Sequence, residues 1–466
     1  LICVESFMFK KIVDYFKAPA DVPVTMSDDE VKKAYKKGRW DIFSSCFIGY
    51  TVFHLTRKNI ATALPALESD LGYSNLQLGL LGSALYFAYM FGKFINGVVA
   101  DKADARKFIT TALFCSSIAN ILFALCPLFI SKGFVIHGQP LLLVAMAFFW
   151  GINGWFQSMG FPGIAKSLAF WWSNKERGTV WSLWTTSHQL GTTCAFLLAG
   201  WLIPRYGWQS AFIIPGIINL VVCIYLATHM HDRPQTVGLP DVELFKEGKA
   251  DETPEEVDEE AHLSYVDILK KYVFLNPTMW ILALAFTFVY ICRCGTEDWI
   301  IKYLCNVKDN SLEVATQKQT FLPLFGIAGT LLAGVFSDKI FKGKRMPVTM
   351  LFLAGFALCV FGLLENKGSS LIHTIIDYAC IGGIGFFTAG PQMFVGGICA
   401  VETGSKKVAS AATGFCGLFG YLGAILSGIG TGYFVDNFGW SGALYFWIFA
   451  AICCMLILVP VWRKGV

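Results

Sequence analysis

Apolar runs of membrane-spanning length recur along this chain, and they limit most strongly what it can fold into. A helix needs about 20 apolar residues to cross the hydrocarbon layer of a bilayer. The sequence therefore predicts an all-α integral membrane protein with about twelve transmembrane helices. The predicted spans are residues 42–66, 76–100, 108–130, 140–165, 178–203, 209–229, 277–303, 319–338, 347–365, 373–398, 408–434 and 440–462.

The composition agrees with a lipid environment. Only 15% of the 466 residues are charged, whereas a soluble domain has roughly 25%. The net charge of +4 is spread over loops and does not indicate a nucleic-acid partner. The 15 cysteines lie mostly in apolar runs and form no zinc-type cluster, so we interpret them as small buried hydrophobic residues. No metal ion or cofactor is expected.

Basic residues are concentrated in alternate loops. Eight lie between Lys10 and Arg39, and later groups begin at Lys102, Lys175 and Lys339. An intervening loop, residues 68–73, has none. Because cytoplasmic loops carry the excess of Lys and Arg, we expect both termini in the cytoplasm. Residues 1–40 lack the pattern of a cleaved signal peptide, so the first apolar run is expected to act as an uncleaved signal.

The two halves of the chain repeat. Four landmarks recur 229 to 237 positions later in the sequence: Gly97 and Gly334 in similar GxxxDK turns, Arg57 and Arg293, Gly207 and Gly439 before tryptophans, and Pro162 and Pro391. We predict a cytoplasmic N-terminal segment (1–40), two pseudo-symmetric six-helix bundles (41–230 and 274–466), and a cytoplasmic linker (231–273) with an acidic stretch at 250–260. The binding site is expected between the bundles, near the membrane midplane.

Arg57 and Arg293 occupy matching places in the first helix of each half. A cation at mid-membrane costs at least about 2.5–3.5 kcal/mol, so such residues are rare and usually functional. Two guanidinium groups suit the oxygens of one phosphate. We therefore predict that they face each other across a central anion site, and that a bound dianion draws the halves together. The alternative is that each arginine pairs with a carboxylate. Glu297 and Asp298 are candidates for Arg293, and Arg57 has no acid in its own span.

Further polar residues accompany the two arginines. Lys93 has Tyr89 one turn away, although its side chain can also extend toward the end of its span near Asp101. His188 has polar neighbours, which favour a cavity position over simple packing. Other candidates are Tyr50 and His54 before Arg57, Tyr290 before Arg293, and Tyr421 in a glycine-rich helix, where packing and cavity-lining roles are equally open.

At these residues the chain resembles the organophosphate:phosphate antiporter family of the major facilitator superfamily. The matching motifs are YTVFHLTRKN, YMFGKFINGVVADKADAR, FWWSNKERGTVWSLWTTSHQLG, RPQTVGLP, FVYICRCGTEDW, GTLLAGVFSDKIF and GFCGLFGYLG, which span most of the chain. The resemblance is closest to the hexose-phosphate transport and sensor branch. It implies the major facilitator fold and a bacterial inner-membrane location.

The resemblance also implies roles for individual residues. It makes Arg57 and Arg293 the phosphate-binding arginines, Lys93 and His188 accessory site residues, Tyr50, Tyr89, Tyr290 and Tyr421 aromatics of the path, and Asp298 a matching acid. Two positions depart from the family: His54 replaces a common tyrosine, and Thr185 replaces a common asparagine. Both positions can contact the organic part of a substrate, which leaves its identity open.

The leading hypothesis is a secondary transporter that imports a sugar phosphate, with glucose 6-phosphate favoured, in exchange for inorganic phosphate. It is expected to work as a monomer in the lipid bilayer. The alternatives are a membrane sensor of external sugar phosphate that acts on a kinase, and a carrier of glycerol 3-phosphate. No GxxxxGK[ST] motif, nucleophile–base pair or cofactor fingerprint occurs, so neither ATP-driven transport nor an enzyme is predicted.

Overall fold

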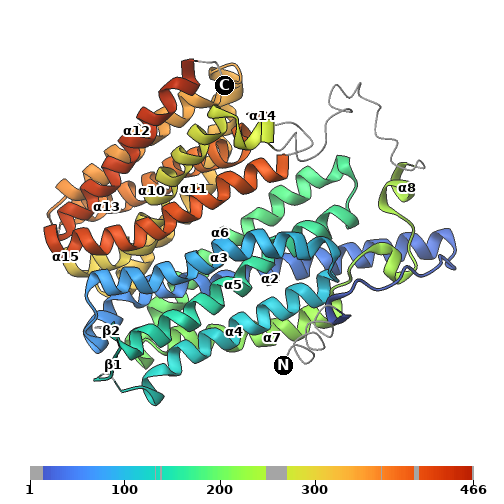
Figure 1. The fold of residues 1–466 in the computed structure, drawn as a ribbon, viewed down its shortest axis with the longest axis horizontal. Helices are drawn as coiled ribbons and strands as arrows, with labels where there is room; N and C mark the ends of the chain where they lie inside the picture. Colours follow the sequence, from blue (N-terminus) through green and yellow to red (C-terminus); the bar gives the residue numbers. More distant parts are fainter. Residues whose placement is uncertain are drawn as a thin grey trace.

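The computed structural model describes residues 14–131, 133–136, 139–247, 270–368, 370–403 and 409–463. These residues form long helices and one pair of two-residue strands (Figure 1). The elements are α2 (Asp28–Leu71), α3 (Asn75–Lys102), α4 (Ala105–Phe129), β1 (Val135–Ile136), β2 (Gln139–Pro140), α5 (Leu141–Trp171), α6 (Asn174–Tyr206), α7 (Ser210–His229), η1 (Pro234–Val237), α8 (Val242–Glu247), η2 (Lys270–Phe274), α10 (Pro277–Val307), α11 (Leu312–Val335), η3 (Phe336–Ile340), α12 (Arg345–Glu365), α13 (Leu371–Met393), η4 (Phe394–Ile398), α14 (Cys399–Thr403) and α15 (Ala409–Arg463).

The helices account for the twelve predicted spans. Nine helices in the described part of the chain are long and apolar enough to cross a membrane. Helices α2 and α6 add two more spans, although they are more polar because they carry residues such as Arg57, Lys58 and His188. The long helix α15 supplies two spans, because Gly439 interrupts it with a φ of 69°, which a glycine adopts without strain.

The first helix is longer than its predicted span. Helix α2 begins at Asp28, fourteen residues before the apolar run, where Ser27 and Glu30 form a capping box. Tyr35, in this extension, stacks on Phe245 of α8 at 4.2 Å between ring centroids. The extension and α8 therefore pack together beside the N-terminal bundle. The acidic stretch 250–260, predicted to be a solvated linker, lies outside the described residues.

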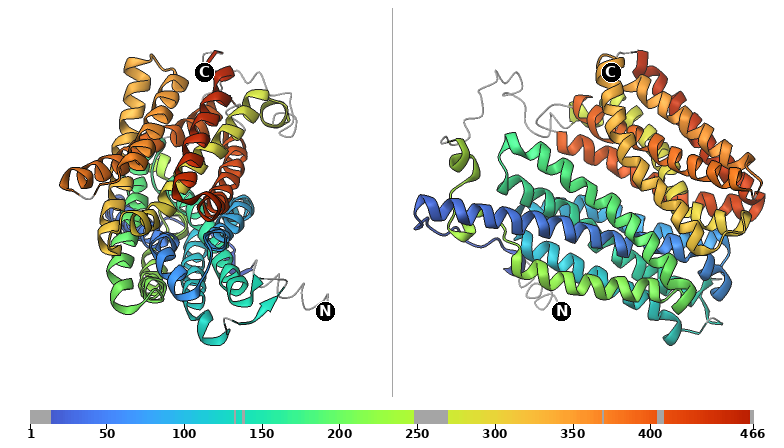
Figure 2. Two further views of the ribbon diagram at one scale, coloured as in Figure 1. Left: turned by 90° about the vertical axis from the view of Figure 1, so that its left-hand side faces the viewer. Right: turned by 180° about the vertical axis from the view of Figure 1, so that it is seen from behind.

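The helices form two bundles, as Figures 1 and 2 show. Helices α2 to α7 pack together in the N-terminal bundle, and α10 to α15 in the C-terminal bundle. The bundles meet through α3 with α15, α6 with α11, and α2 with α10. Arg57 lies in α2 and Arg293 in α10, so each belongs to the first long helix of its bundle and to the interface between them.

The bundles converge at one end, which we call the closed end: the C-terminal end of α2, the start of α3, and residues 428–436 of α15 (Figures 1 and 2). A Cβ atom added to Gly79 would lie 2.2 Å from the carbonyl oxygen of Gly428, so only glycine permits this approach. Asp436 of α15 accepts hydrogen bonds from the backbone of Asn75 and Leu76 (3.1 and 2.8 Å). Toward the other end, where α2 begins, the bundles diverge.

Candidate functional site

Arg57 has an unsatisfied guanidinium nitrogen. Its Nε atom donates to Oε1 of Gln157 at 3.2 Å, and its guanidinium carbon lies 4.6 Å from the centre of the Tyr89 ring. Its Nη2 atom is buried without a hydrogen-bond partner. Among the described residues, no carboxylate lies within 4 Å of this arginine. Such an orphaned donor is costly to bury, and an anionic oxygen is the kind of group that would satisfy it.

A neutral hydrogen-bond network holds Arg57 in place. The Nε2 atom of Gln157 donates to the carbonyl of Phe53 and to the hydroxyls of Thr56 and Ser116, at 2.9 to 3.0 Å. Asn153, Asn120 and Asn219 extend the network, and each is fully buried. Because the Gln157 amide is fixed by donating on one side, its carbonyl oxygen is free to orient Arg57 without neutralising it.

Arg293 has a different environment. Its Nη2 atom lies 3.2 Å from Nε2 of His188 and 3.7 Å from Oε2 of Glu297. Since arginine only donates, the Nε2 atom of His188 accepts this hydrogen bond. Of the carboxylates that the sequence offered as alternative partners of Arg293, Glu297 is therefore the one that contacts it. The reason is local: Glu297 lies one helical turn further along α10, on the same face.

Most of the predicted site residues contact one another in a continuous series. Each makes a ring or cation–ring contact of 4.6 to 5.8 Å with the next, except His188 and Arg293, which share a hydrogen bond. In order, the residues are Tyr50, His54, His188, Arg293, Tyr290, Tyr421, Tyr89 and Arg57. Aromatic rings from both bundles thus lie between the two arginines.

Lys93 lies beside this chain of contacts. Its ammonium is 5.5 Å from the ring centre of Tyr421, which belongs to the other bundle, and 5.9 Å from that of Phe161. The described residues include no ion pair between Lys93 and Asp101. The Lys93 side chain thus lies near the interface between the bundles.

A second group of polar side chains, of which Lys58 and Tyr86 were not predicted, links the bundles next to Arg57. Lys58 of α2 contacts Asp298 and Glu297 of α10, at 2.8 and 3.1 Å. Tyr86 of α3 donates to the other oxygen of Asp298 at 2.6 Å. Asp298, predicted as a site residue, therefore pairs with Lys58 rather than with Arg293. The adjacency of Lys58 to Arg57 and of Glu297 to Asp298 was the available signal, but it did not reveal which charges would meet.

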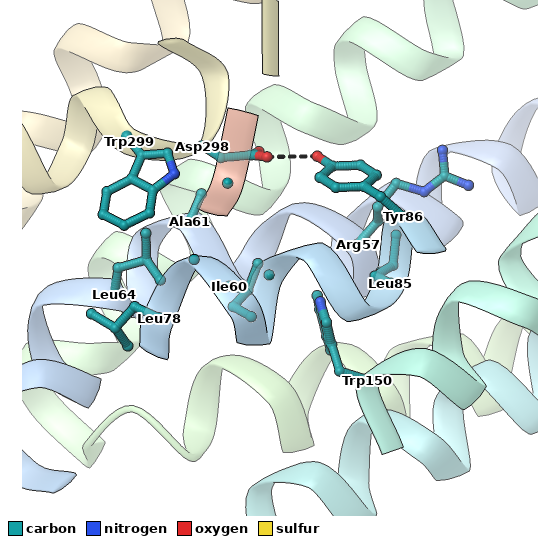
Figure 3. A pocket seen from close by; sticks show the side chains of 13 residues that line it. Arg57, Ile60, Ala61, Leu64, Leu78, Leu85, Tyr86, Trp150, Asp298 and Trp299 are labelled. Atoms are coloured by element: carbon teal, nitrogen blue, oxygen red, sulfur yellow. Dashed lines mark hydrogen bonds between the residues drawn. The ribbon is translucent and has the colours of Figure 1, made fainter. Parts of the chain in front are cut away.

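Figure 3 shows the pocket that adjoins these residues, lined by Arg57, Tyr86, Asp298, Trp150 and apolar side chains. Its volume of about 20 Å³ is close to the space that one water molecule needs. Leu64 and Leu78, near the closed end, line the same pocket. The pocket between Arg57 and the closed end therefore has room for about one water molecule in this conformation.

Comparison with known proteins identifies the family. The model of the Major Facilitator Superfamily matches residues 46–401. The chain belongs to this superfamily. It is 36% identical over 458 residues to a probable hexose phosphate transport protein of Chlamydia pneumoniae, covering 96% of each chain. It is also 35% identical to the membrane sensor protein UhpC of Escherichia coli, covering 96% of this chain and 98% of that one.

The fold has a solved counterpart. A D-xylose-proton symporter superposes with a TM-score of 0.71 at 14% identity, covering 90% of this chain and 97% of that one. At this identity the likeness concerns the fold alone. Together with the family match, it confirms the major facilitator fold and places the chain among membrane-embedded transporters rather than enzymes. The relatives agree with the organophosphate:phosphate antiporter branch.

Proposed function

We propose that this protein exchanges a sugar phosphate, with glucose 6-phosphate favoured, for inorganic phosphate by alternating access. The observation that carries the proposal is the buried, unpartnered Nη2 atom of Arg57, positioned by neutral groups and free of carboxylates among the described residues. A phosphoryl oxygen satisfies this donor and supplies the missing negative charge. The similarity to a probable hexose phosphate transport protein supports the same substrate class.

In this proposal each half supplies one arginine to the same phosphoryl group. Arg57 contributes its free nitrogen, and Arg293 exchanges its loose 3.7 Å contact with Glu297 for the phosphate. Lys93, His188, His54 and the four tyrosines line the space for the rest of the substrate. Because phosphate binds both halves at once, it stabilises the arrangement in which they are close, and only a loaded carrier crosses efficiently between its two states.

The basic loops support an orientation with both termini in the cytoplasm, and the similarity to bacterial transport proteins supports an inner-membrane location. In this proposal the closed end faces outward, and the conformation described here opens inward. The bundles 41–230 and 274–466 then move as two units joined by the linker 231–273, and one chain is sufficient for transport. Breaking the Lys58–Asp298 contact and the Asp436 hydrogen bonds is required to expose the site to the outside.

The test uses purified protein in vesicles loaded with inorganic phosphate. Uptake of labelled glucose 6-phosphate should depend on internal phosphate and should fall strongly in Arg57→Lys and Arg293→Lys. Absence of exchange, or undiminished exchange in both variants, would overturn the proposal. Competition by glycerol 3-phosphate and other phosphates then identifies the preferred substrate.

The same experiment addresses the sensor alternative, which the similarity to UhpC favours. A sensor binds sugar phosphate and catalyses little exchange. Saturable binding of glucose 6-phosphate without uptake into phosphate-loaded vesicles would therefore indicate a receptor, whereas coupled exchange indicates a carrier.

A further inference from the structure

Glu297 is a carboxylate inside a site that otherwise suits an anion. Its side chain is 3% exposed, and its Oε2 atom makes ion pairs but no well-aligned hydrogen bond. It lies 3.1 Å from Lys58 and 3.7 Å from Arg293. A buried carboxylate with so few hydrogen bonds is costly and needs a reason.

Its neighbour Asp298 is far better satisfied. Asp298 accepts from Lys58 at 2.8 Å and from the Tyr86 hydroxyl at 2.6 Å, so its charge is matched and hydrogen-bonded. Lys58 is thus shared between two acids, and its contact with Glu297 is the longer of the two. Of the two carboxylates, Glu297 is the one that also contacts Arg293.

We propose that Glu297 is a proton-coupling site: when a phosphate takes its place beside Arg293, Glu297 takes up a proton. This rests on the proposed function. The proton comes from water on the open side and ends on a Glu297 carboxyl oxygen, so one unit of the added negative charge is compensated. When phosphate leaves, the proton is released and Glu297 returns to Arg293.

The surrounding groups support this assignment. Glu297 contacts Lys58 of α2 and Arg293 of α10, and Asp298 is its neighbour in α10. Two further groups contact these cations: His188 of α6 contacts Arg293, and Tyr86 of α3 contacts Lys58. From α11, Gln319 donates to the Glu297 backbone carbonyl at 3.0 Å rather than to the carboxylate. Once phosphate neutralises Arg293, the carboxylate retains only a shared lysine and gains an anionic neighbour, which favours its protonation.

The test measures proton uptake on binding of inorganic phosphate to the full-length protein in detergent. Calorimetry in two buffers of different ionisation enthalpy gives the number of protons taken up per phosphate. The wild type should take up close to one proton more than Glu297→Gln, because the titration of phosphate itself is common to both. Glu365→Gln, which changes an exposed acid at the end of α12, should match the wild type.

Affinity gives a second readout. The ratio of wild-type to Glu297→Gln affinity should change by up to about tenfold per pH unit, because one linked proton gives that slope. At high pH, Glu297→Gln should bind phosphate more tightly, since its competing charge is gone. Equal proton numbers and a constant ratio would overturn the proton site.

Two safeguards keep the result clear. If Glu297→Gln does not fold, vesicles of the wild type with an internal pH dye replace it: phosphate exchange across a pH gradient should move protons with the anion, and exchange without proton movement would overturn the proposal. If neither the wild type nor Glu365→Gln binds phosphate at all, the proposed function fails instead, which is a distinguishable outcome.

Discussion

The two bundles hold their arginines by different means. Arg57 is oriented by a neutral amide, Gln157, within a network of buried Asn, Ser and Thr side chains, and no described carboxylate pairs with it. Arg293 contacts a histidine and a glutamate. The two halves thus share the position of the guanidinium but differ in its surroundings: no described carboxylate pairs with Arg57, whereas Arg293 shares its charge with Glu297.

We expect the largest effect on exchange from substitution of the two arginines. Arg57→Lys removes the planar fork at the site with no other charge partner, and should lower the exchange rate constant kcat/KM by roughly 100-fold, about 3 kcal/mol. Arg293→Lys should cost about tenfold, because its charge is already partly compensated. Initial rates of glucose 6-phosphate uptake measure both. Equal losses would show that the two halves contribute alike.

A smaller effect on phosphate binding is expected from substitution of Gln157, the glutamine that contacts Arg57. Gln157→Leu removes the acceptor of Arg57 and should weaken phosphate binding about tenfold, with a stability loss of about 1–3 kcal/mol from the groups left unpaired. Thermal unfolding and phosphate titration measure the two effects.

Its matched control is Gln319→Leu in the other bundle, where Gln319 donates to the backbone of Glu297. This change should cost similar stability but less affinity, because it does not touch a guanidinium. An affinity loss as large as that of Gln157→Leu would contradict the interpretation that Gln157 positions Arg57 for phosphate.

A smaller effect is expected where the halves join. Lys58→Met leaves Asp298 and Glu297 without their shared cation and should shift the protein away from the conformation described here. A cysteine placed at Leu78, in a background without reactive cysteines, should then react several-fold faster with an external impermeant thiol reagent. Unchanged labelling would mean that the ion pairs of Lys58 do not keep the closed end shut.

The smallest effect is expected at the surface of that end. Asp436→Asn removes the carboxylate that caps α3 from the opposite bundle, a contact of about 1 kcal/mol. The same Leu78 labelling assay should show an increase of a few-fold. An increase larger than that of Lys58→Met would reverse the order and make the cap the principal contact of the closed end.

Much of the fold was predictable because its signals are local. Apolar runs of spanning length predicted the helices, and the recurring landmarks predicted two equivalent halves. The extension of α2 back to Asp28 was missed, because it depends on packing of Tyr35 against the distant Phe245 rather than on hydropathy.

The candidate site divides in the same way. The sequence identified Arg57, Arg293 and the nearby tyrosines as candidates, because charged and hydroxyl groups are rare within apolar runs. Their contacts did not follow. Gln157 reaches Arg57 from a helix 100 positions later, and Lys58 meets Asp298 at a separation of 240 positions.

Hydropathy and the repeated landmarks are properties of the sequence, and they indicated a membrane-spanning chain of two related halves, each with one arginine in its first helix. Which of the charges are satisfied followed only from the packing of the helices. Pairing in a low-dielectric interior depends on distances of a few ångströms between helices remote in sequence, because Coulomb energy changes steeply there. For this reason three features became known only from the structure: the unpaired nitrogen of Arg57, the contact of Lys58 with the other bundle, and the position of Glu297 beside Arg293.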